Sequence, residues 1–301
     1  MNLIDFSRYF STEEICKKHL EQMRWPNGVT CPFCASERIY VTKRGYKCAD
    51  KNCYKKFSVT VGTYLQGTKI PLVKWFMAIY ISTAHKKGIS SHQLAKDIGI
   101  TQKWAWFMLQ RIRGIMTEKN AVKLKGVIQA DETLIGGKEK NKHAVKRNPK
   151  AYGRGGNKTV VLGVRDFGGE VKAWVIPDAS RQYITPLIQQ NVKQGSFLFT
   201  DTWGGYNDLS KSFVHFKINH IEGQYVRGFV HTNGIENFWS QMKRGINGIY
   251  HQVSPKHLHR YVSEYSFRYN TRKIGDSLRV DFAFAQCAGR LKWNDLIADK
   301  V

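Results

Sequence analysis

Acidic residues are scarce in this chain of 301 residues: 23 Asp and Glu stand against 48 Lys and Arg, a formal net charge of +25. Such an excess indicates a polyanionic partner, and nucleic acid is the usual one. An anionic membrane is the competing partner, but no run approaches the ~18 apolar residues of a membrane span and no lipidation signal is present. The charge therefore favours a nucleic-acid partner over a membrane.

A secretory signal is also missing, because the first residues lack the basic-then-apolar layout of a signal peptide. We therefore expect a cytoplasmic protein whose six cysteines are metal ligands or reduced thiols rather than disulfides. Hydrophobic residues make up 42% and aromatic residues 13% of the chain, so packed cores are expected rather than disorder.

Four of the cysteines form two close pairs with thirteen residues between the pairs: Cys31 and Cys34, then Cys48 and Cys53. Two such knuckles joined by a β-hairpin suit a tetrahedral zinc site with four thiolates. The zinc would be structural, because four thiolates leave no coordination position open. Its binding would fold a small basic module that binds DNA. The alternative is four thiols in an ordinary core. Cys16 and Cys287 are single and are expected to be packing residues.

Residues 1–25 are predicted to form an amphipathic helix with Ser11 as its N-cap, and a longer helical stretch is predicted over 71–116. In that stretch Ala95 lies four residues before Gly99, which is typical of a helix-turn-helix. Thr101 can cap the second helix, whose first residues would face the major groove of DNA: Gln102, Lys103 and Trp104. A plain helical bundle is the alternative.

Two aspartates each end an apolar run with the character of a central strand. Asp131 ends residues 126–131, and Asp201 ends residues 196–201. A charged side chain in such a strand is costly unless it is paired or binds a metal. The pattern therefore predicts two adjacent strands that converge on one metal site.

A third carboxylate is predicted on a helix over about residues 232–245. At about 100° per residue one face of this helix is polar and the other is apolar. The polar face would hold Asn233, Glu236, Ser240 and Lys243, and the apolar face Ile235, Phe238, Trp239, Met242 and Ile246. This places an acid and, two turns later, a phosphate-binding lysine on the face that can turn toward the strand ends.

These acids suit the chemistry of phosphodiester cleavage. Hard ions such as Mg²⁺ or Mn²⁺ prefer carboxylate oxygens, and two ions ~4 Å apart can activate a nucleophile and stabilise the leaving oxygen. Asp131, Asp201 and Glu236 are the predicted catalytic metal ligands, with Asn233 and Lys243 in supporting roles. The alternative for each acid alone is a solvated surface carboxylate.

Four stretches give the chain a wider resemblance: residues 130–137, 200–206, 231–240 and 254–261. With the cysteine pairs ahead of them, the chain resembles bacterial insertion-sequence transposases, which carry an N-terminal zinc ribbon before a DDE catalytic domain of ribonuclease-H-like fold. Lys243 follows Glu236 by seven residues, as this superfamily commonly has it. Relatives vary between Glu and Asn at the third ligand, and we favour Glu236 over Asn233.

The resemblance implies an α/β fold, a mixed sheet flanked by helices with Asp131 on its first strand and Asp201 on its fourth. The expected domains are 1–62 (helix and zinc ribbon), 63–120 (helix-turn-helix) and 121–301 (catalytic). The implied activity is binding of terminal inverted repeats, cleavage of DNA ends and attack of the freed 3′-hydroxyl on target DNA. The implied partners are double-stranded DNA of transposon ends and target, and at least a second copy of the chain, in the cytoplasm at the bacterial nucleoid.

A basic stretch over residues 138–158 is then predicted to lie along the DNA backbone. Its cations are Lys138, Lys140, Lys142, Lys146, Arg147, Lys150, Arg154 and Lys158. A merely solvated loop is the alternative. For the whole chain the rivals are a DNA-binding regulator without catalysis, a ribonuclease-H-like nuclease without strand transfer, and an inactive or domesticated copy.

Overall fold

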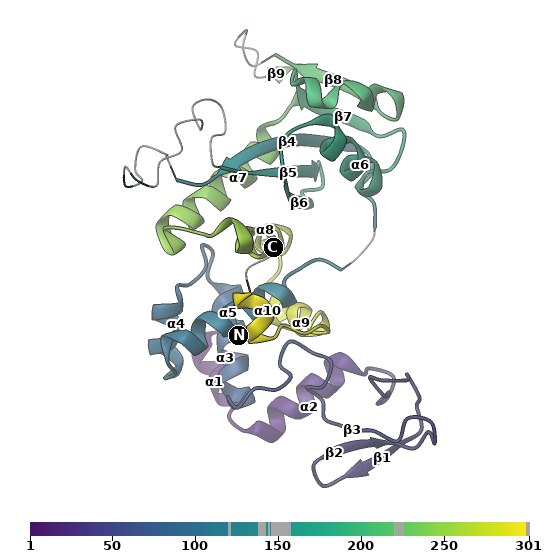
Figure 1. The fold of residues 1–301 in the computed structure, drawn as a ribbon, viewed down its shortest axis with the longest axis vertical. Coiled ribbons are helices and arrows are strands. Elements are labelled where there is room, and N and C mark those ends of the chain that lie inside the picture. The colour runs from purple at the N-terminus through teal and green to yellow at the C-terminus, as the bar shows by residue number, and fades with distance from the viewer. Residues whose placement is uncertain are drawn as a thin grey trace. The chain divides into compact units, whose positions relative to one another are not determined.

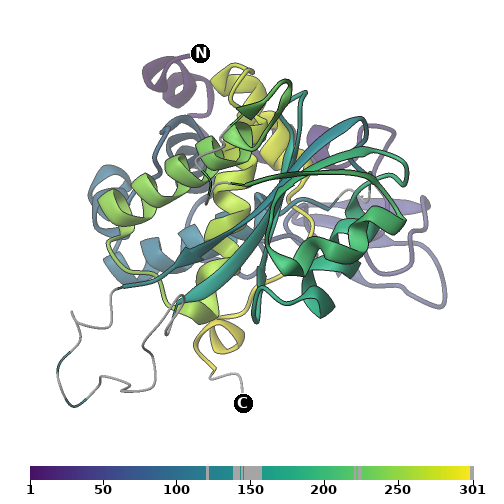
Figure 2. The same ribbon diagram turned by 90° about the horizontal axis from the view of Figure 1, so that it is seen from above.

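The computed structural model describes residues 1–119, 122–137, 143, 145, 158–219, 222 and 226–298. Its backbone divides into two compact units, which Figure 1 and Figure 2 show from two sides: unit 1 is Met1–Thr117 with Lys273–Val301, and unit 2 is Glu118–Arg272. The expected catalytic domain ran from residue 121 to 301. The structure instead groups the segment from Lys273 onward with the N-terminal unit.

Unit 1 is mainly helical. Its elements are α1 (Leu3–Tyr9), α2 (Glu13–Arg24), β1 (Ile39–Thr42), β2 (Gly45–Cys48), β3 (Lys56–Phe57), α3 (Leu72–Ala84), α4 (Ser91–Ile98), α5 (Gln102–Ile115), α9 (Asp276–Ala285) and α10 (Trp293–Ile297). The N-terminal segment is two helices rather than one. Thr12, not Ser11, caps α2: its backbone is extended and its Oγ1 accepts a hydrogen bond from the N–H of Ile15 at 3.3 Å.

Side-chain contacts explain why the C-terminal segment belongs to unit 1. The ring of Phe284 on α9 is fully buried and lies 4.2 Å from that of Phe76 on α3. Asp281 accepts a hydrogen bond from Nε2 of His19 at 3.0 Å. These partners lie far away in the sequence, so no local pattern could indicate them. In the part of the chain that the structure describes, no helix is long and apolar enough to cross a membrane.

The turn between α4 and α5 has the predicted geometry. Gly99 adopts a left-handed conformation with φ 61°, and its N–H donates to the carbonyl of Ala95. Such a conformation favours glycine, because a Cβ would be strained there. Thr101 caps α5 through a hydrogen bond from the N–H of Trp104 at 3.4 Å. The predicted turn at Gly99 and the predicted cap at Thr101 are confirmed.

Unit 2 is built on a five-stranded sheet in the order β6-β5-β4-β7-β8. Its elements are β4 (Val127–Ile135), β5 (Thr159–Asp166), β6 (Val171–Ile176), α6 (Arg181–Asn191), β7 (Phe197–Asp201), the 3₁₀ helix η3 (Gly204–Lys211), β8 (Val214–Ile218), β9 (Val226–Arg227), β10 (Val230–His231), α7 (Asn233–Gly245), the π-helical turn η5 (Ile246–Tyr250) and α8 (Pro255–Asn270). The pairs β4–β5 and β5–β6 are antiparallel, whereas β4–β7 and β7–β8 are parallel. The expected ribonuclease-H-like mixed sheet is confirmed, with Asp131 on its first strand and Asp201 at the end of its fourth.

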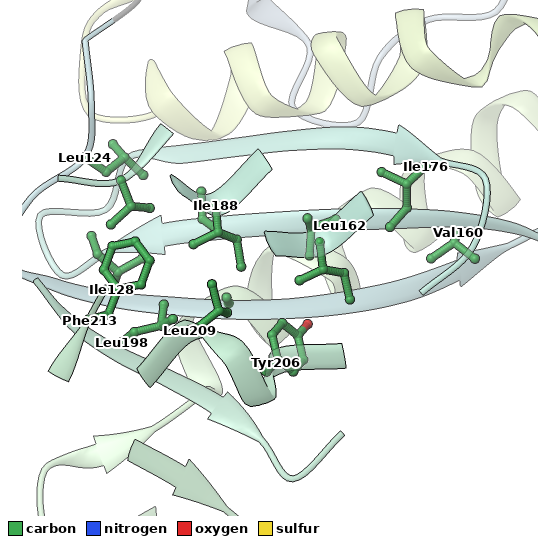
Figure 3. Packing of buried hydrophobic residues seen from close by; sticks show 14 residues of the cluster. Leu124, Ile128, Val160, Leu162, Ile176, Ile188, Leu198, Tyr206, Leu209 and Phe213 are labelled. Carbon is green, nitrogen blue, oxygen red and sulfur yellow. The ribbon is translucent and has the colours of Figure 1, made fainter. Parts of the chain in front are cut away.

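Each face of this sheet has its own core. On one face Ile128, Leu162 and Leu198 pack against Ile188 of α6, as Figure 3 shows. On the other face helices α7 and α8 cover the sheet, for example through Val161 beneath the apolar side of α7. Burying one such side chain contributes roughly 1.5–3 kcal/mol, so the two cores hold β4 rigidly between two helical layers.

Candidate zinc and carboxylate sites

The four predicted zinc ligands converge in unit 1. The Sγ atoms of Cys31, Cys34, Cys48 and Cys53 all lie within 4.8 Å of one another. Two of the separations are 3.7 Å, between Cys31 and Cys53, and 3.6 Å, between Cys34 and Cys48. Thiolates bound tetrahedrally at a Zn–S distance of about 2.3 Å lie about 3.8 Å apart. The cluster therefore fits a structural zinc ion.

The chain segment between the cysteine pairs forms the predicted hairpin. Strands β1 and β2 are antiparallel, with Ile39 opposite Cys48, and β3 adds a third strand. Tyr46 of β2, Phe57 of β3 and Trp25 pack together on one side of this sheet. The two remaining cysteines, Cys16 and Cys287, are buried elsewhere in unit 1, as expected of packing residues.

The predicted carboxylate site begins with Asp131 on β4. Burial raises the pKa of Asp131 to about 7, and the negative charges of Glu132 and Asp201 add to this effect. Glu132 is held in turn by the buried hydroxyl of Tyr206, which donates to its Oε2 at 2.5 Å. A carboxyl whose pKa is raised by burial and by neighbouring negative charge lies at a site where bound positive charge is favourable.

Trp239 of α7 fixes the orientation of the Asp131 carboxylate. Its Nε1–H donates to Oδ2 of Asp131 at 3.0 Å. Gly163 stands opposite Asp131 on β5, and a Cβ added there would lie 2.6 Å from Cη2 of Trp239. The glycine therefore allows the indole ring to lie close over the strand and reach the carboxylate.

Gln129 connects the same strand to the beginning of α7. This fully buried residue lies two positions before Asp131, so both side chains point to one face of the sheet. Its Oε1 accepts from the N–H of Ile235, and its Nε2 donates to the carbonyl of His231, both at 3.0 Å. These bonds hold the first turn of α7, which carries Glu236, against the strand of Asp131.

The position of Asp201 relative to Asp131 follows from the parallel register of β4 and β7. Gln129 pairs with Phe199, and each aspartate lies two residues beyond its member of this pair. The two side chains therefore point to the same face of the sheet, just beyond the last paired residues of β4 and β7, and the charge of Asp201 contributes to the raised pKa of Asp131. Oδ1 of Asp201 accepts from the N–H of Trp203 at 2.9 Å. The two aspartates thus lie on neighbouring strands, and their convergence on one metal site stays a prediction.

Helix α7 shows both predicted faces. Its apolar side chains are buried: Ile235, Phe238, Trp239 and Met242. Its polar side lines a pocket of about 830 Å³ that Asp131, Glu236 and Lys243 share. Oε1 of Glu236 accepts from the hydroxyl of Thr232 at 2.6 Å. Asn233 is exposed at the first position of the helix and is not among the residues that line this pocket.

The donor set of this site fits hard divalent cations, because all three predicted ligands are carboxylates. Among the described residues, however, only the four cysteines form a cluster of three or more metal-ligating side chains within 4.8 Å. Asp131, Asp201 and Glu236 are arranged more loosely than that in this structure.

The structure describes only some of the predicted DNA-binding residues. Gln102 and Lys103 are exposed at the start of α5, where Nε2 of Gln102 donates to Oγ of Ser91 at 2.9 Å. Lys103 places its Nζ 5.0 Å from the ring centroid of Trp293. Lys158 is exposed just before β5. The other predicted cations lie outside the described residues: Lys138, Lys140, Lys142, Lys146, Arg147, Lys150 and Arg154.

Sequence reasoning missed several residues that support the carboxylate site, among them Gln129, Trp239 and Gly163. The sequence could have indicated the role of Gln129, since a polar amide inside an apolar strand needs a buried hydrogen-bond partner. Trp239 was assigned only to the apolar face of its helix, although its indole N–H needs an acceptor when the ring is buried. Gly163 had no local signal, because only the packed helix shows why a side chain is excluded there.

Comparison with known proteins agrees with this architecture. Residues 11–56 match the transposase zinc-ribbon domain, and residues 123–270 match the ISXO2-like transposase domain. The class of protein is thus a transposase in which a zinc ribbon precedes a ribonuclease-H-like unit. Within that class, the chain belongs to the ISXO2-like transposase family, and the resemblance predicted from the sequence is confirmed.

Two relatives illustrate the likeness. A protein of Halobacterium salinarum, described as an uncharacterized protein in transposable element ISH50, is 27% identical over 274 residues, which cover 86% of this chain and 91% of the relative. An uncharacterized transposase-like protein of Haemophilus influenzae is 31% identical over 107 residues, which cover 35% of this chain and 85% of the relative.

Proposed function

We propose that the protein cleaves the ends of its DNA element and joins the freed 3′-hydroxyl groups to target DNA. The supporting observation is the matching position of Asp131 and Asp201, each two residues beyond the Gln129–Phe199 pair of neighbouring parallel strands. Glu236 and Lys243 line the same pocket as Asp131. A regulator that only binds DNA has no need of this carboxylate set.

Asp131, Asp201 and Glu236 are the proposed ligands of Mg²⁺ or Mn²⁺. Two such ions, when bound, supply activation of a nucleophile and neutralise charge on the leaving oxygen. Trp239 and Thr232 orient the carboxylates of Asp131 and Glu236 through their hydrogen bonds. Glu236 rather than Asn233 is the proposed third ligand, because Glu236 lines the pocket with Asp131.

Cations beside this pocket are proposed to bind the DNA backbone. Lys243 and Arg244 line it together with the carboxylates and are suited to contact phosphate oxygens. The basic stretch over 138–158, the start of α5 and the zinc ribbon would add contacts to double-stranded DNA, including the terminal inverted repeats.

At least a homodimer is proposed, since two DNA ends must be joined. The protein would act in the cytoplasm at the nucleoid.

The test uses a plasmid that contains the gene with its own flanking DNA. Purified protein is incubated with this plasmid and Mg²⁺ or Mn²⁺, and with a chelator in parallel, and cleaved and joined products are resolved. We expect metal-dependent cuts at the element ends and joined products with wild-type protein. An Asp201→Asn variant is expected to give neither, whereas an Asp178→Asn variant, altered at an exposed acid elsewhere in unit 2, is expected to behave as wild type.

Other outcomes separate the rivals. Cuts without joined products would indicate a nuclease on the same fold. Tight binding without metal-dependent cuts would overturn the proposal in favour of a DNA-binding regulator or a domesticated copy.

A further inference from the structure

One face of the zinc ribbon has two exposed tyrosines, an exposed lysine and a half-buried lysine, none of which belongs to the zinc site or the core. We call Tyr40, Lys47, Tyr54 and Lys56 the ribbon face. Tyr40 pairs with Lys47 across β1 and β2, and Lys47 pairs with Lys56 across β2 and β3. Residues directly opposite in antiparallel strands point to the same side of a sheet. The Nζ of Lys47 also lies 3.3 Å from the ring centroid of Tyr54, which brings this ring to the same side.

The opposite side of the sheet holds the core of the ribbon. Tyr46 and Phe57 stack there with ring centroids 5.6 Å apart, and Trp25 contacts both rings. The tyrosines of the ribbon face do not take part: Tyr40 is 57% exposed and Tyr54 is 56% exposed. Packing therefore gives no reason for two aromatic rings on the solvent side.

The backbone at Tyr54 strengthens this point. Its φ is 49°, in the left-handed region that a bulky side chain rarely adopts and that glycine adopts without strain. A tyrosine at this position costs stability, and more than half of its surface stays exposed. The backbone is also left-handed at Ala35, directly after Cys34, so this conformation belongs to the turn that follows each cysteine pair. The turn requires no aromatic ring, so the choice of tyrosine has another reason.

Charge indicates the partner. Between Val29 and Phe57 the ribbon has seven Lys and Arg but only two acids, Glu37 and Asp50. Exposed rings beside cations are the chemistry with which proteins bind single-stranded nucleic acid, because unpaired bases stack on the rings and the cations contact phosphates. In a duplex the base faces are already stacked on one another, so the rings would gain little.

We propose that the ribbon face binds single-stranded DNA, with unpaired bases stacked on Tyr40 and Tyr54 and with phosphates contacted by Lys47 and Lys56. The face then adds recognition of unpaired strands to a protein otherwise built to hold duplex. The site lies in unit 1 and requires no cleavage, so it stands or falls independently of the carboxylate chemistry in unit 2.

The experiment measures binding of the full-length, zinc-loaded protein to three fluorescent probes by anisotropy. The probes are a short single strand of mixed sequence, the same sequence as a duplex, and a strand of equal length that lacks bases. Tyr40→Ala is expected to weaken binding of the single strand roughly 5- to 150-fold, and to leave binding of the duplex and the base-free strand unchanged. Tyr40→Phe retains a ring and is expected to bind like wild type.

Two further variants control for structure. Tyr9→Ala removes a tyrosine on α1 that is also 57% exposed, and no change is expected. Tyr54→Gly relieves the left-handed backbone, so it is expected to keep its zinc and resist denaturant at least as well as wild type while it binds the single strand more weakly. Two results would overturn the proposal. One is an equal loss of affinity for the single strand and the duplex, and the other is an unchanged affinity of Tyr40→Ala and Tyr54→Gly for the single strand.

Discussion

At the scale of single residues, the carboxylate of Asp131 depends on neighbours that are not acids. The indole of Trp239 donates to it, and Gly163 leaves the space in which that indole lies. Gln129, two residues earlier, ties the same strand to the first turn of α7. The orientation of one proposed metal ligand therefore results from three side-chain positions, contributed by β4, β5 and α7.

A Trp239→Phe substitution tests this arrangement. The phenylalanine ring keeps most of the packing but lacks the N–H, so Asp131 loses a hydrogen bond to its charged form. We expect DNA cleavage to slow by roughly tenfold, which corresponds to about 1.4 kcal/mol, with DNA binding unchanged. Single-turnover cleavage and anisotropy on the same protein measure the two effects.

Gly163→Ala provides the matched steric change, because its Cβ would meet the indole at 2.6 Å and displace it from Asp131. It should slow cleavage in the same direction as Trp239→Phe. If both variants cleave at the wild-type rate, the indole does not orient the carboxylate.

At the scale of elements, α7 could be predicted accurately, because its apolar positions recur at helical spacing and leave one polar face. The two strands that contain Asp131 and Asp201 could be predicted from their apolar runs, and β7 ends at Asp201 as expected. The expected end of the other strand was wrong, because β4 stays paired with β5 past Asp131 as far as Ile135. The assignment of α9 to unit 1 could not be predicted. Its partners, such as Phe76, are near in space but remote in sequence, and a local pattern contains no information about them.

Helix α7 carries both candidates for the proposed third ligand. Both side chains are exposed, but only Glu236 lines the pocket with Asp131. Glu236→Gln is therefore expected to slow cleavage by more than about 100-fold, since a metal ligand contributes several kcal/mol to the transition state. Asn233→Ala is expected to slow it far less. The reverse order of the two rates would make Asn233 the ligand.

The zinc ribbon permits a prediction about metal content. Cys31→Ser is expected to remove most of the bound zinc and to unfold the hairpin of β1 and β2, because metal binding and folding are coupled in such small modules. Elemental analysis and protease sensitivity of the ribbon give the two readouts. Cys287→Ala is the control, because this buried cysteine lies outside the cluster. Equal zinc in Cys31→Ser and wild type would exclude the four-thiolate site.

At the scale of the whole molecule, two compact units divide the proposed work. Unit 1 contains the zinc ribbon and the α4–α5 turn, and unit 2 contains the carboxylates. The net charge of +25 suits a protein that binds DNA through both units. Loss of a carboxylate should therefore separate cleavage from binding, since the cations that bind phosphate remain.

Single-turnover cleavage of element-end DNA by wild-type protein and by an Asp131→Asn variant tests the carboxylate site most directly. Both proteins are assayed with Mg²⁺, and their affinity for the same DNA is measured in Ca²⁺. We predict that the variant binds DNA as tightly as wild type and produces no detectable cuts. Cleavage by Asp131→Asn at the wild-type rate would contradict a catalytic role for the carboxylate of Asp131.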